Sequence, residues 1–211
     1  MKIAFFSESI ADESALKILV AGILGEEIEE TNLPNRLEYR SSSHLDKNLP
    51  SVISAVHYNS DAEALIVVSD SDDTVVHTQR HRETDNEKCR LCQLQKAANK
   101  TVAKLQAFAG NEVIKVAVGV PVPAIEAWYL CGVNAQVNEA AWIRKQNDER
   151  ISYDRKSLKL ELYGNDRPPM RLLTEKAVES AKRLKNDLER LEQLFPEGFG
   201  LFANEIRSWK R

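Results

Sequence analysis

Four acidic residues follow short apolar runs, and this placement could support metal-dependent chemistry. They are Glu8, Asp70, Asp72 and Glu126. An Asp-x-Asp pair at a strand end points two carboxylates toward one ion, and unpaired carboxylates at one place repel each other. Mg²⁺ and Mn²⁺ prefer such oxygen ligands. A helix cap, an Asx-turn or a surface position explains each acid alone, but the set favours a Mg²⁺ (or Mn²⁺) site.

Two histidines and two cysteines lie within sixteen residues. His77 and His81 form H-x₃-H, and Cys89 and Cys92 form C-x₂-C seven residues later. Both spacings are usual zinc half-sites, and a Cys₂His₂ set would give a tetrahedral structural Zn²⁺ site. The alternative is two surface histidines in a polar loop and two cysteines on a helix, one of them buried. Segment 77–92 is therefore a candidate zinc knuckle, which would hold the chain where it leaves Asp72.

Alternating apolar runs and helical patterns predict the elements that position these residues. Strands are expected at Ile3–Phe6, Glu26–Leu33, Ala64–Val68 and Val113–Val120. Helices are expected at Ser9–Leu24, Ser51–Tyr58, Lys88–Ala109 and Ala124–Leu130. Strands that alternate with helices predict an α/β fold with a mainly parallel, Rossmann-like sheet. In such sheets, sites form past the carboxyl ends of the strands, where the four acids would lie.

No further strong strand is predicted in the last third of the chain. A long amphipathic helix is expected over Thr174–Phe195 and a short one over Phe202–Trp209, while the polar segment Asn147–Pro169 is expected to loop out. We therefore expect an α/β core over residues 1–133, including the candidate zinc knuckle, and a helical C-terminal extension over residues 134–211. The long helix would allow a homodimer without requiring one.

The charge of the chain is unevenly distributed. Residues 144–211 hold 16 Lys/Arg against 12 Asp/Glu, whereas residues 1–143 hold 13 against 20. The net charge of −3 excludes a uniformly basic nucleic-acid coat but leaves room for local basic surfaces. Six basic residues could form a rim above the acidic site, although a solvated helix surface explains any one of them. They are Arg144, Lys145, Arg150, Arg155, Lys156 and Lys159.

Composition and cysteine content indicate a cytoplasmic globular protein. The 43% hydrophobic and 29% charged residues exclude wholesale disorder, and no apolar run reaches the roughly 20 residues of a membrane-spanning helix. Three cysteines without an export signal argue against a disulfide framework. No Walker loop is present, so any ATPase function would come from a partner.

The residues around the acids resemble the toprim (topoisomerase–primase) signature. Segment 5–12 places Glu8 at the end of the first strand, and segment 66–72 places an Asp-x-Asp pair at the end of a later one. With Glu126 in segment 123–128, the pattern is similar to small stand-alone toprim-like proteins of bacterial defence loci and to overcoming-lysogenization-defect nucleases. The resemblance covers about residues 1–132. Toprim sequences usually have Gly where this chain has Ser9, which either tolerates the turn or marks a degraded site.

The resemblance implies a toprim core that binds Mg²⁺ through Asp70 and Asp72. Glu8 would act as a general acid/base or an additional ligand, and Glu126 could complete a second metal position. The implied function is a Mg²⁺-dependent nuclease acting on DNA or RNA, in anti-phage (antiviral) defence beside a partner ATPase. One alternative is a non-enzymatic scaffold that binds the ATPase through the zinc knuckle and the helix around Leu184–Leu194. Another is a Rossmann-like phosphatase or nucleotide-processing enzyme with a small substrate.

Overall fold

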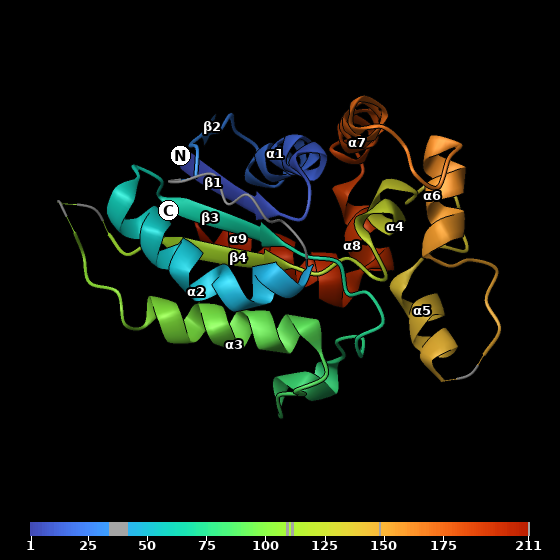
Figure 1. The fold of residues 1–211 in the computed structure, drawn as a ribbon, viewed down its shortest axis with the longest axis horizontal. Coiled ribbons are helices and arrows are strands. Elements are labelled where there is room, and N and C mark those ends of the chain that lie inside the picture. Colours follow the sequence, from blue (N-terminus) through green and yellow to red (C-terminus); the bar gives the residue numbers. More distant parts are fainter. Residues whose placement is uncertain (34–41, 109, 111, 148, 211) are drawn as a thin grey trace.

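The computed structural model describes residues 1–33, 42–108, 110, 112–147 and 149–210, and a four-stranded parallel sheet lies at its centre. The strands are β1 (Lys2–Ser7), β2 (Glu29–Glu30), β3 (Ala64–Val68) and β4 (Lys115–Gly119). Their order across the sheet is β2-β1-β3-β4 (Figure 1). Helices separate the strands along the chain, so the predicted α/β class and parallel sheet are confirmed.

The register of the sheet brings the carboxyl ends of three strands to one edge. Ser7 pairs with Val68, and Val68 pairs with Gly119, so β1, β3 and β4 end side by side. The backbone N–H of Ser69 continues this pairing by donating to the carbonyl of Gly119 at 3.2 Å. The residues that follow the three strands therefore share the edge at which parallel sheets form their sites.

Helices cover both faces of the sheet, which explains the unbroken apolar run of β3. The first face shares a hydrophobic core with α1 (Ile10–Leu24), α7 (Met170–Leu184) and α9 (Leu201–Ser208). The second shares a core with α2 (Ser42–Asn59) and α3 (Arg90–Val102), as Figure 1 shows. Side chains of a strand alternate between the two cores: Ile66 belongs to the first and Val67 to the second.

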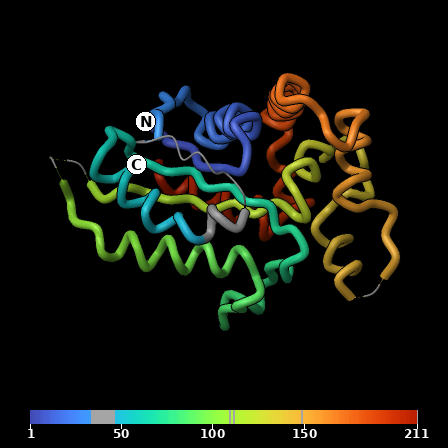
Figure 2. Tube along the Cα trace, in the orientation of Figure 1, coloured from blue at the N-terminus to red at the C-terminus, as the bar shows by residue number. Residues whose placement is uncertain are grey.

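The C-terminal helices complete the first core. α7 packs along α1, and α9 lies against β4 behind the sheet in the view of Figure 2. Leu184 and Phe202 are buried in the same cluster as Ile3 of β1. The helical C-terminal region is thus present as expected, and it forms a layer on the sheet.

Ser9 begins α1 and adopts a backbone conformation that needs no glycine. Its φ of −142° and ψ of 139° are extended, and its hydroxyl accepts a hydrogen bond from the backbone N–H of Ala11 at 3.2 Å. A serine in this position satisfies one of the free N–H groups at the helix start. The turn after β1 therefore tolerates Ser9, and the missing glycine causes no strain.

The predicted long helix over Thr174–Phe195 is wrong, because the chain forms two helices there. α7 ends at Leu184, and α8 spans Leu188–Leu194. Asn186 and Asp187 lie in the turn between them, where their backbone N–H groups bond to Arg183 and Leu184. Asn and Asp disfavour helix interiors because their side chains compete for backbone groups.

The expectation that Asn147–Pro169 loops out is also wrong, because this segment contains α6 (Arg155–Tyr163). Asp154 and Ser157 form a capping box at its start, and Gly164 ends it with a φ of 69°. α6 follows α4 (Ile125–Tyr129) and α5 (Glu139–Gln146), and it packs against α4. It becomes important below because it faces the predicted acidic site.

Several other elements have different lengths from those expected. β2 is only two residues long, and α3 ends at Val102 instead of Ala109. α2 begins at Ser42 instead of Ser51. A 3₁₀ turn at Gln79–Arg82 and a π-helical turn at Pro196–Gly200 complete the architecture.

Candidate functional site

The loop after β1 and the loop after β3 are joined through the carboxylate of Glu8. Its Oε1 accepts hydrogen bonds from the hydroxyl of Ser69 at 2.9 Å and from the backbone N–H of Asp70 at 3.0 Å. These two donors belong to the residues that directly follow β3. Two of the predicted strand-end acids, Glu8 and Asp70, are therefore neighbours at the carboxyl edge of the sheet.

Asp70 extends this connection to the loop after β4. Its Oδ1 accepts a hydrogen bond from the backbone N–H of Ile125 at 2.9 Å, at the first residue of α4. The backbone N–H of Asp72 donates to the carbonyl of Pro123 at 3.0 Å. Asp72 has a φ of 51°, a left-handed conformation that Asp adopts more readily than most residues. The three loops thus form one hydrogen-bonded unit, with Glu126 in the first turn of α4.

The acids repel one another in this partly dry environment. Burial raises the pKa of Asp70 well above its ordinary value, and the charges of Glu8 and Glu126 raise it further. Burial also raises the pKa of Glu8 and of Glu126. Asp12, which accepts a hydrogen bond from the hydroxyl of Tyr129 at 3.1 Å, has its pKa raised to about 7, first by burial and then by Glu126. Such a cluster calls for neighbouring positive charge.

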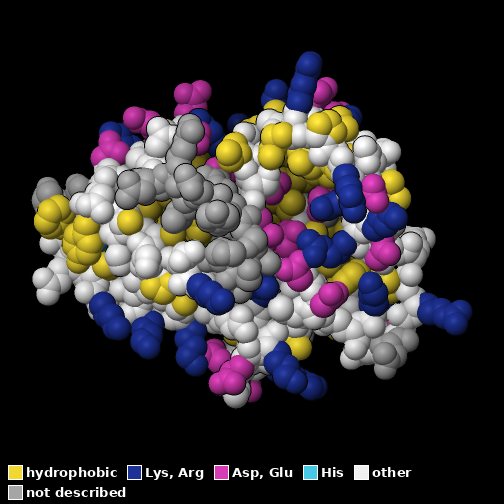
Figure 3. Space-filling view, in the orientation of Figure 1, with side chains coloured by type: hydrophobic (Ala, Val, Ile, Leu, Met, Phe, Trp, Pro, Cys, Tyr) yellow, Lys and Arg dark blue, Asp and Glu magenta, His cyan; other side chains and the backbone are white. Residues whose placement is uncertain are grey.

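α6 supplies positive charge from the segment that was expected to be a loop. Arg155 donates to Oδ2 of Asp70 at 3.1 Å and also to Oδ1 of Asp72. Lys159 lies one turn later on the same face of α6, and its Nζ is 3.9 Å from Oε1 of Glu126. Figure 3 shows acidic side chains in a hollow with Lys and Arg side chains beside it.

Arg90 adds a third cation from the opposite side of the sheet edge. It is the first residue of α3, is buried, and donates to the hydroxyl of Ser69 at 3.1 Å. Its Nη2 lies 3.8 Å from Oδ2 of Asp72. The guanidinium of Arg90 is thus directed inward, toward the acids.

The predicted Mg²⁺ ligands form ion pairs and hydrogen bonds in this arrangement. Arg155 connects Asp70 and Asp72, where the sequence predicted a divalent cation. Oε2 of Glu126 is buried and has no hydrogen-bond partner among the described residues. Across the described part of the chain, these carboxylates are not among the groups whose ligand atoms converge as a metal site requires. The Mg²⁺ site therefore remains a prediction.

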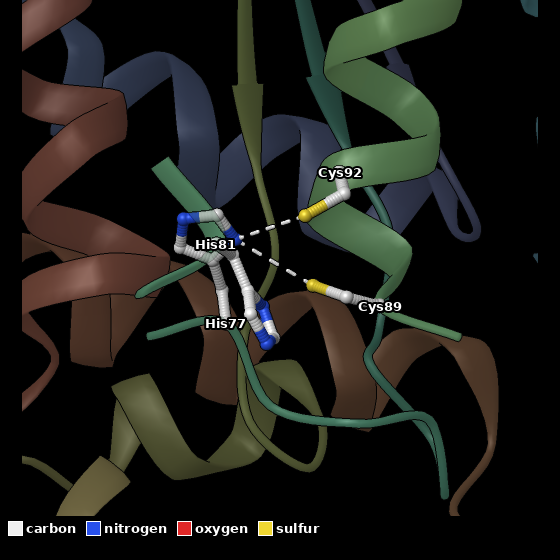
Figure 4. Close-up of side chains that lie close together, drawn as sticks. All are labelled: His77, His81, Cys89 and Cys92. Atoms are coloured by element: carbon white, nitrogen blue, oxygen red, sulfur yellow. Dashed lines mark hydrogen bonds between the residues drawn. The ribbon is translucent and has the colours of Figure 1, made fainter. Parts of the chain in front are cut away.

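The four predicted zinc ligands do converge. The ligand atoms of His77, His81, Cys89 and Cys92 all lie within 4.8 Å of one another. Nδ1 of His77 is 3.5 Å from Sγ of Cys89 and 3.4 Å from Sγ of Cys92, as the dashed lines of Figure 4 show. The four side chains could therefore hold a metal ion.

Local structure explains why these four side chains meet. Cys89 is the N-cap of α3, and Cys92 lies in its first turn, so both thiols project from the start of one helix. His81 lies in the 3₁₀ turn, which brings it back beside His77 with the ring centroids 5.2 Å apart. The two distances from Nδ1 of His77 to the sulfurs fit a tetrahedral zinc site, because Zn–S and Zn–N bonds of about 2.3 and 2.0 Å give an S···N separation of about 3.5 Å.

The pKa shifts of His77 and Cys89 are compatible with metal binding. Burial lowers the pKa of His77, so its imidazole is neutral and can bind a metal. Burial raises the pKa of Cys89 to about 12, so the thiol keeps its proton until a metal ion displaces it. Nδ1 of His81 is buried and has no hydrogen-bond partner among the described residues.

The structure also shows residues that the sequence analysis missed. Glu197, in the π-helical turn, lies beside His77, and buried Glu139 accepts two backbone hydrogen bonds from that turn. Of the predicted basic rim, Arg155 and Lys159 reach the acids, whereas Lys156 pairs with Asp166. The predicted rim of basic residues was the sequence signal for this face of α6.

Comparisons with protein-family models, curated proteins and solved structures found no match. Among the described residues, no helix is both long enough and apolar enough to cross a membrane.

Proposed function

We propose that this protein is a metal-dependent, toprim-like enzyme that cleaves phosphodiester bonds of DNA or RNA at the site of Glu8, Asp70, Asp72 and Glu126. The observation that supports it is the hydrogen-bonded junction of the three loops, because it gathers acids from three strand ends at one sheet edge. Metal-dependent phosphoryl transfer needs carboxylates in such an arrangement.

The charge balance of the site fits a divalent cation. Five carboxylates of the cluster, with Glu13 beside them, face three cationic side chains, so full ionisation would leave a net negative charge. The carboxylates are Glu8, Asp12, Asp70, Asp72 and Glu126, and the cations are Arg90, Arg155 and Lys159. Burial is the main cause of the raised pKa values of Glu8, Asp70 and Glu126, and neighbouring carboxylates add to it at Glu8 and Asp70. A bound Mg²⁺ or Mn²⁺ would stabilise the phosphate charge and lower the pKa of a bound water.

Each residue of the proposed site has a separate task. Asp70 and Asp72 would be the metal ligands, Glu8 would accept or donate a proton, and Glu126 would provide a second ligand position through its unpartnered oxygen. Arg155 would have to leave the two aspartates when the ion binds. Its guanidinium could then bind a phosphate group of the substrate.

A cleavage assay with a matched control tests this function. Single- and double-stranded DNA and structured RNA are incubated with Mg²⁺ or Mn²⁺ and with wild type, the double variant Asp70→Asn/Asp72→Asn, or Asp85→Asn. Asp85 is an exposed acid that pairs with Lys96. We expect the double variant to lose on the order of 10²-fold or more in rate and Asp85→Asn to keep it. Equal cleavage by the double variant, or cleavage in EDTA, would contradict the proposal.

The cluster of His77, His81, Cys89 and Cys92 is proposed to hold a structural Zn²⁺. Two thiolates and two imidazoles are a usual zinc shell, and both cysteines of the cluster are free thiols. Metal analysis of the purified protein should find one zinc per chain. Zinc that is absent from wild type, or that remains in Cys89→Ser/Cys92→Ser, would contradict this assignment.

The second candidate function is a scaffold that binds a partner ATPase, as the defence-locus resemblance implies. Arg155 favours it, because an arginine that holds both aspartates would suit a site kept only for structure. A stoichiometric ATPase that copurifies with the protein, together with no cleavage of any nucleic acid by the complex, would support the scaffold over the nuclease.

A further inference from the structure

We propose that Glu197 is a positioning residue of the metal centre: it orients the imidazole of His77 and so ties segment 77–92 to the C-terminal layer. Glu197 lies in the π-helical turn, 120 residues after His77 in the sequence. This inference rests on the proposed zinc at the centre. Glu197 is not one of the four proposed ligands, and the sequence pattern assigned it no role.

The two nitrogens of the His77 ring face different partners. Nδ1 faces both cysteine sulfurs, at 3.5 and 3.4 Å, whereas Nε2 lies 3.8 Å from Oε2 of Glu197. Metal-binding histidines commonly direct their second N–H at a carboxylate, which fixes the tautomer and the ring orientation. His77 and Glu197 are 6% and 7% exposed, so water competes little for this contact.

Glu197 can serve this role without disturbing the charge of the centre. Two thiolates balance the charge of one Zn²⁺, so the centre needs no further anion. Nη2 of Arg82 contacts both carboxylate oxygens of Glu197, at 3.1 and 3.0 Å, and thereby neutralises it. Charge balance therefore does not require Glu197, and its contribution is the direction in which it holds the ring.

The backbone around Glu197 is held in place independently of the metal centre. The backbone N–H groups of Glu197 and Gly198 donate to the carboxylate of buried Glu139, at 2.9 and 3.0 Å. The carbonyl of Gly198 accepts a hydrogen bond from Val120 at 3.4 Å, and a side chain at Gly198 would clash with the carbonyl of Val120. The carboxylate of Glu197 is thus presented to His77 from a fixed position, as an orienting group requires.

Zinc affinity measured on the full chain tests the inference. Wild type, Glu197→Ala and Glu197→Gln compete with a chromophoric chelator for Zn²⁺ at fixed pH, and Co²⁺ spectra report the ligand geometry. We expect Glu197→Ala to bind zinc about 10–100-fold more weakly. Glu197→Gln should recover most of this loss, because its amide oxygen can occupy the same position, facing Nε2 of His77.

The matched control is Glu192→Ala. Glu192 lies in α8, in the same C-terminal layer, and it also pairs with an arginine, Arg207, at 2.8 Å. Its loss should leave the zinc affinity within about twofold of wild type. Unchanged affinity in Glu197→Ala, or an equal loss in Glu192→Ala, would overturn the role of Glu197. If wild type binds no zinc, the zinc assignment fails first, and the role of Glu197 fails with it.

Discussion

Arg155 donates a hydrogen bond to Oδ2 of Asp70 over 3.1 Å and joins residues 85 positions apart in the sequence. The same guanidinium contacts Asp72, so a planar cation connects both members of the Asp-x-Asp pair. An arginine and a divalent ion cannot occupy this position together. If the proposed function is right, Arg155 and the metal ion therefore compete for the two aspartates.

Replacing Arg155 by alanine should lower the thermal stability of the metal-free protein and increase its response to Mn²⁺. Without the guanidinium, Asp70 and Asp72 lose their closest counter-charge, and a buried charge left unpaired typically costs several kcal/mol. Because Arg155 is only partly buried, we expect about 1–2 kcal/mol here. Added Mn²⁺ should raise Tm more in Arg155→Ala than in wild type, which thermal scans with and without the ion would measure.

Arg144→Ala is the matched control for Arg155→Ala. Arg144 also lies in the helical region after β4, but it pairs with Glu149 on an exposed surface. Its variant should show the wild-type response to Mn²⁺. An equal response in wild type, Arg155→Ala and Arg144→Ala would contradict the competition between Arg155 and the ion.

Asp12→Asn should stabilise the metal-free protein at alkaline pH. The pKa of Asp12 is raised from 3.8 to about 7, so the folded state holds its proton more tightly than the unfolded state does. The folding stability contributed by this group is therefore complete below pH 4 and is lost as the pH rises toward 7. Asparagine cannot ionise, and its oxygen still accepts from Tyr129, so it avoids this loss. We expect a gain on the order of 1–3 kcal/mol at pH 8 and little change at pH 4.

Urea unfolding at both pH values would measure this difference. Asp61→Asn is the control, because the pKa of Asp61 is shifted in the opposite direction: a side-chain hydrogen bond from Lys2 lowers it. That variant should gain no stability at pH 8. A pH-independent effect of Asp12→Asn would contradict the raised pKa of Asp12.

The sheet edge could be predicted from the sequence because it depends on local patterns. The apolar run Ala64–Val68 matches β3 residue for residue. Residues that follow parallel strands meet at the carboxyl edge of the sheet, so their position follows from the strand prediction. The cysteine and histidine spacings likewise specify a compact cluster, since helix and turn periodicity limits how far such residues can separate. Both are short-range features.

The partners of these side chains could not be predicted, because they arrive from distant parts of the chain. Arg155 and Lys159 reach the acids only because α6 packs against α4, and nothing in the local sequence specifies that packing. Glu197 reaches His77 through the hydrogen bonds of Glu139, which hold the turn. Tertiary packing of this kind decides which cation meets which acid, and a single sequence carries little signal for it.

Removing zinc should lower the thermal stability of the protein by several degrees. A ligand that binds only the folded state stabilises it by about 4 kcal/mol when its free concentration is 1,000-fold above Kd. For a chain of this size, that is about 8–16 °C in Tm. Thermal scans with and without a strong zinc chelator should show this drop in wild type and no further drop in Cys92→Ala.

Cys131→Ala is the control for the zinc experiment. Cys131 is buried near the end of α4 and lies outside the cluster of four ligands. This variant should keep the full response to the chelator. A response that disappears in Cys131→Ala, or persists in Cys92→Ala, would contradict the ligand set.

The metal centre and the carboxylate site should be coupled through Arg90, which directly follows the proposed ligand Cys89. Arg90 donates to Ser69, and Ser69 donates to Glu8, so a short hydrogen-bonded chain leads from the centre to the acids. Burial raises the pKa of Glu8, and the charge of Arg90 opposes that rise. Arg90→Met should therefore raise the pKa of Glu8 further. If Glu8 acts as a base, the acidic limb of the pH–rate profile for cleavage should move to higher pH.

The control variant is Arg82→Met, which removes a neighbouring arginine that pairs with Glu197 instead. This variant should leave the acidic limb in place. An unshifted limb in Arg90→Met would show that Arg90 does not act on Glu8, and the two sites would then be only neighbours.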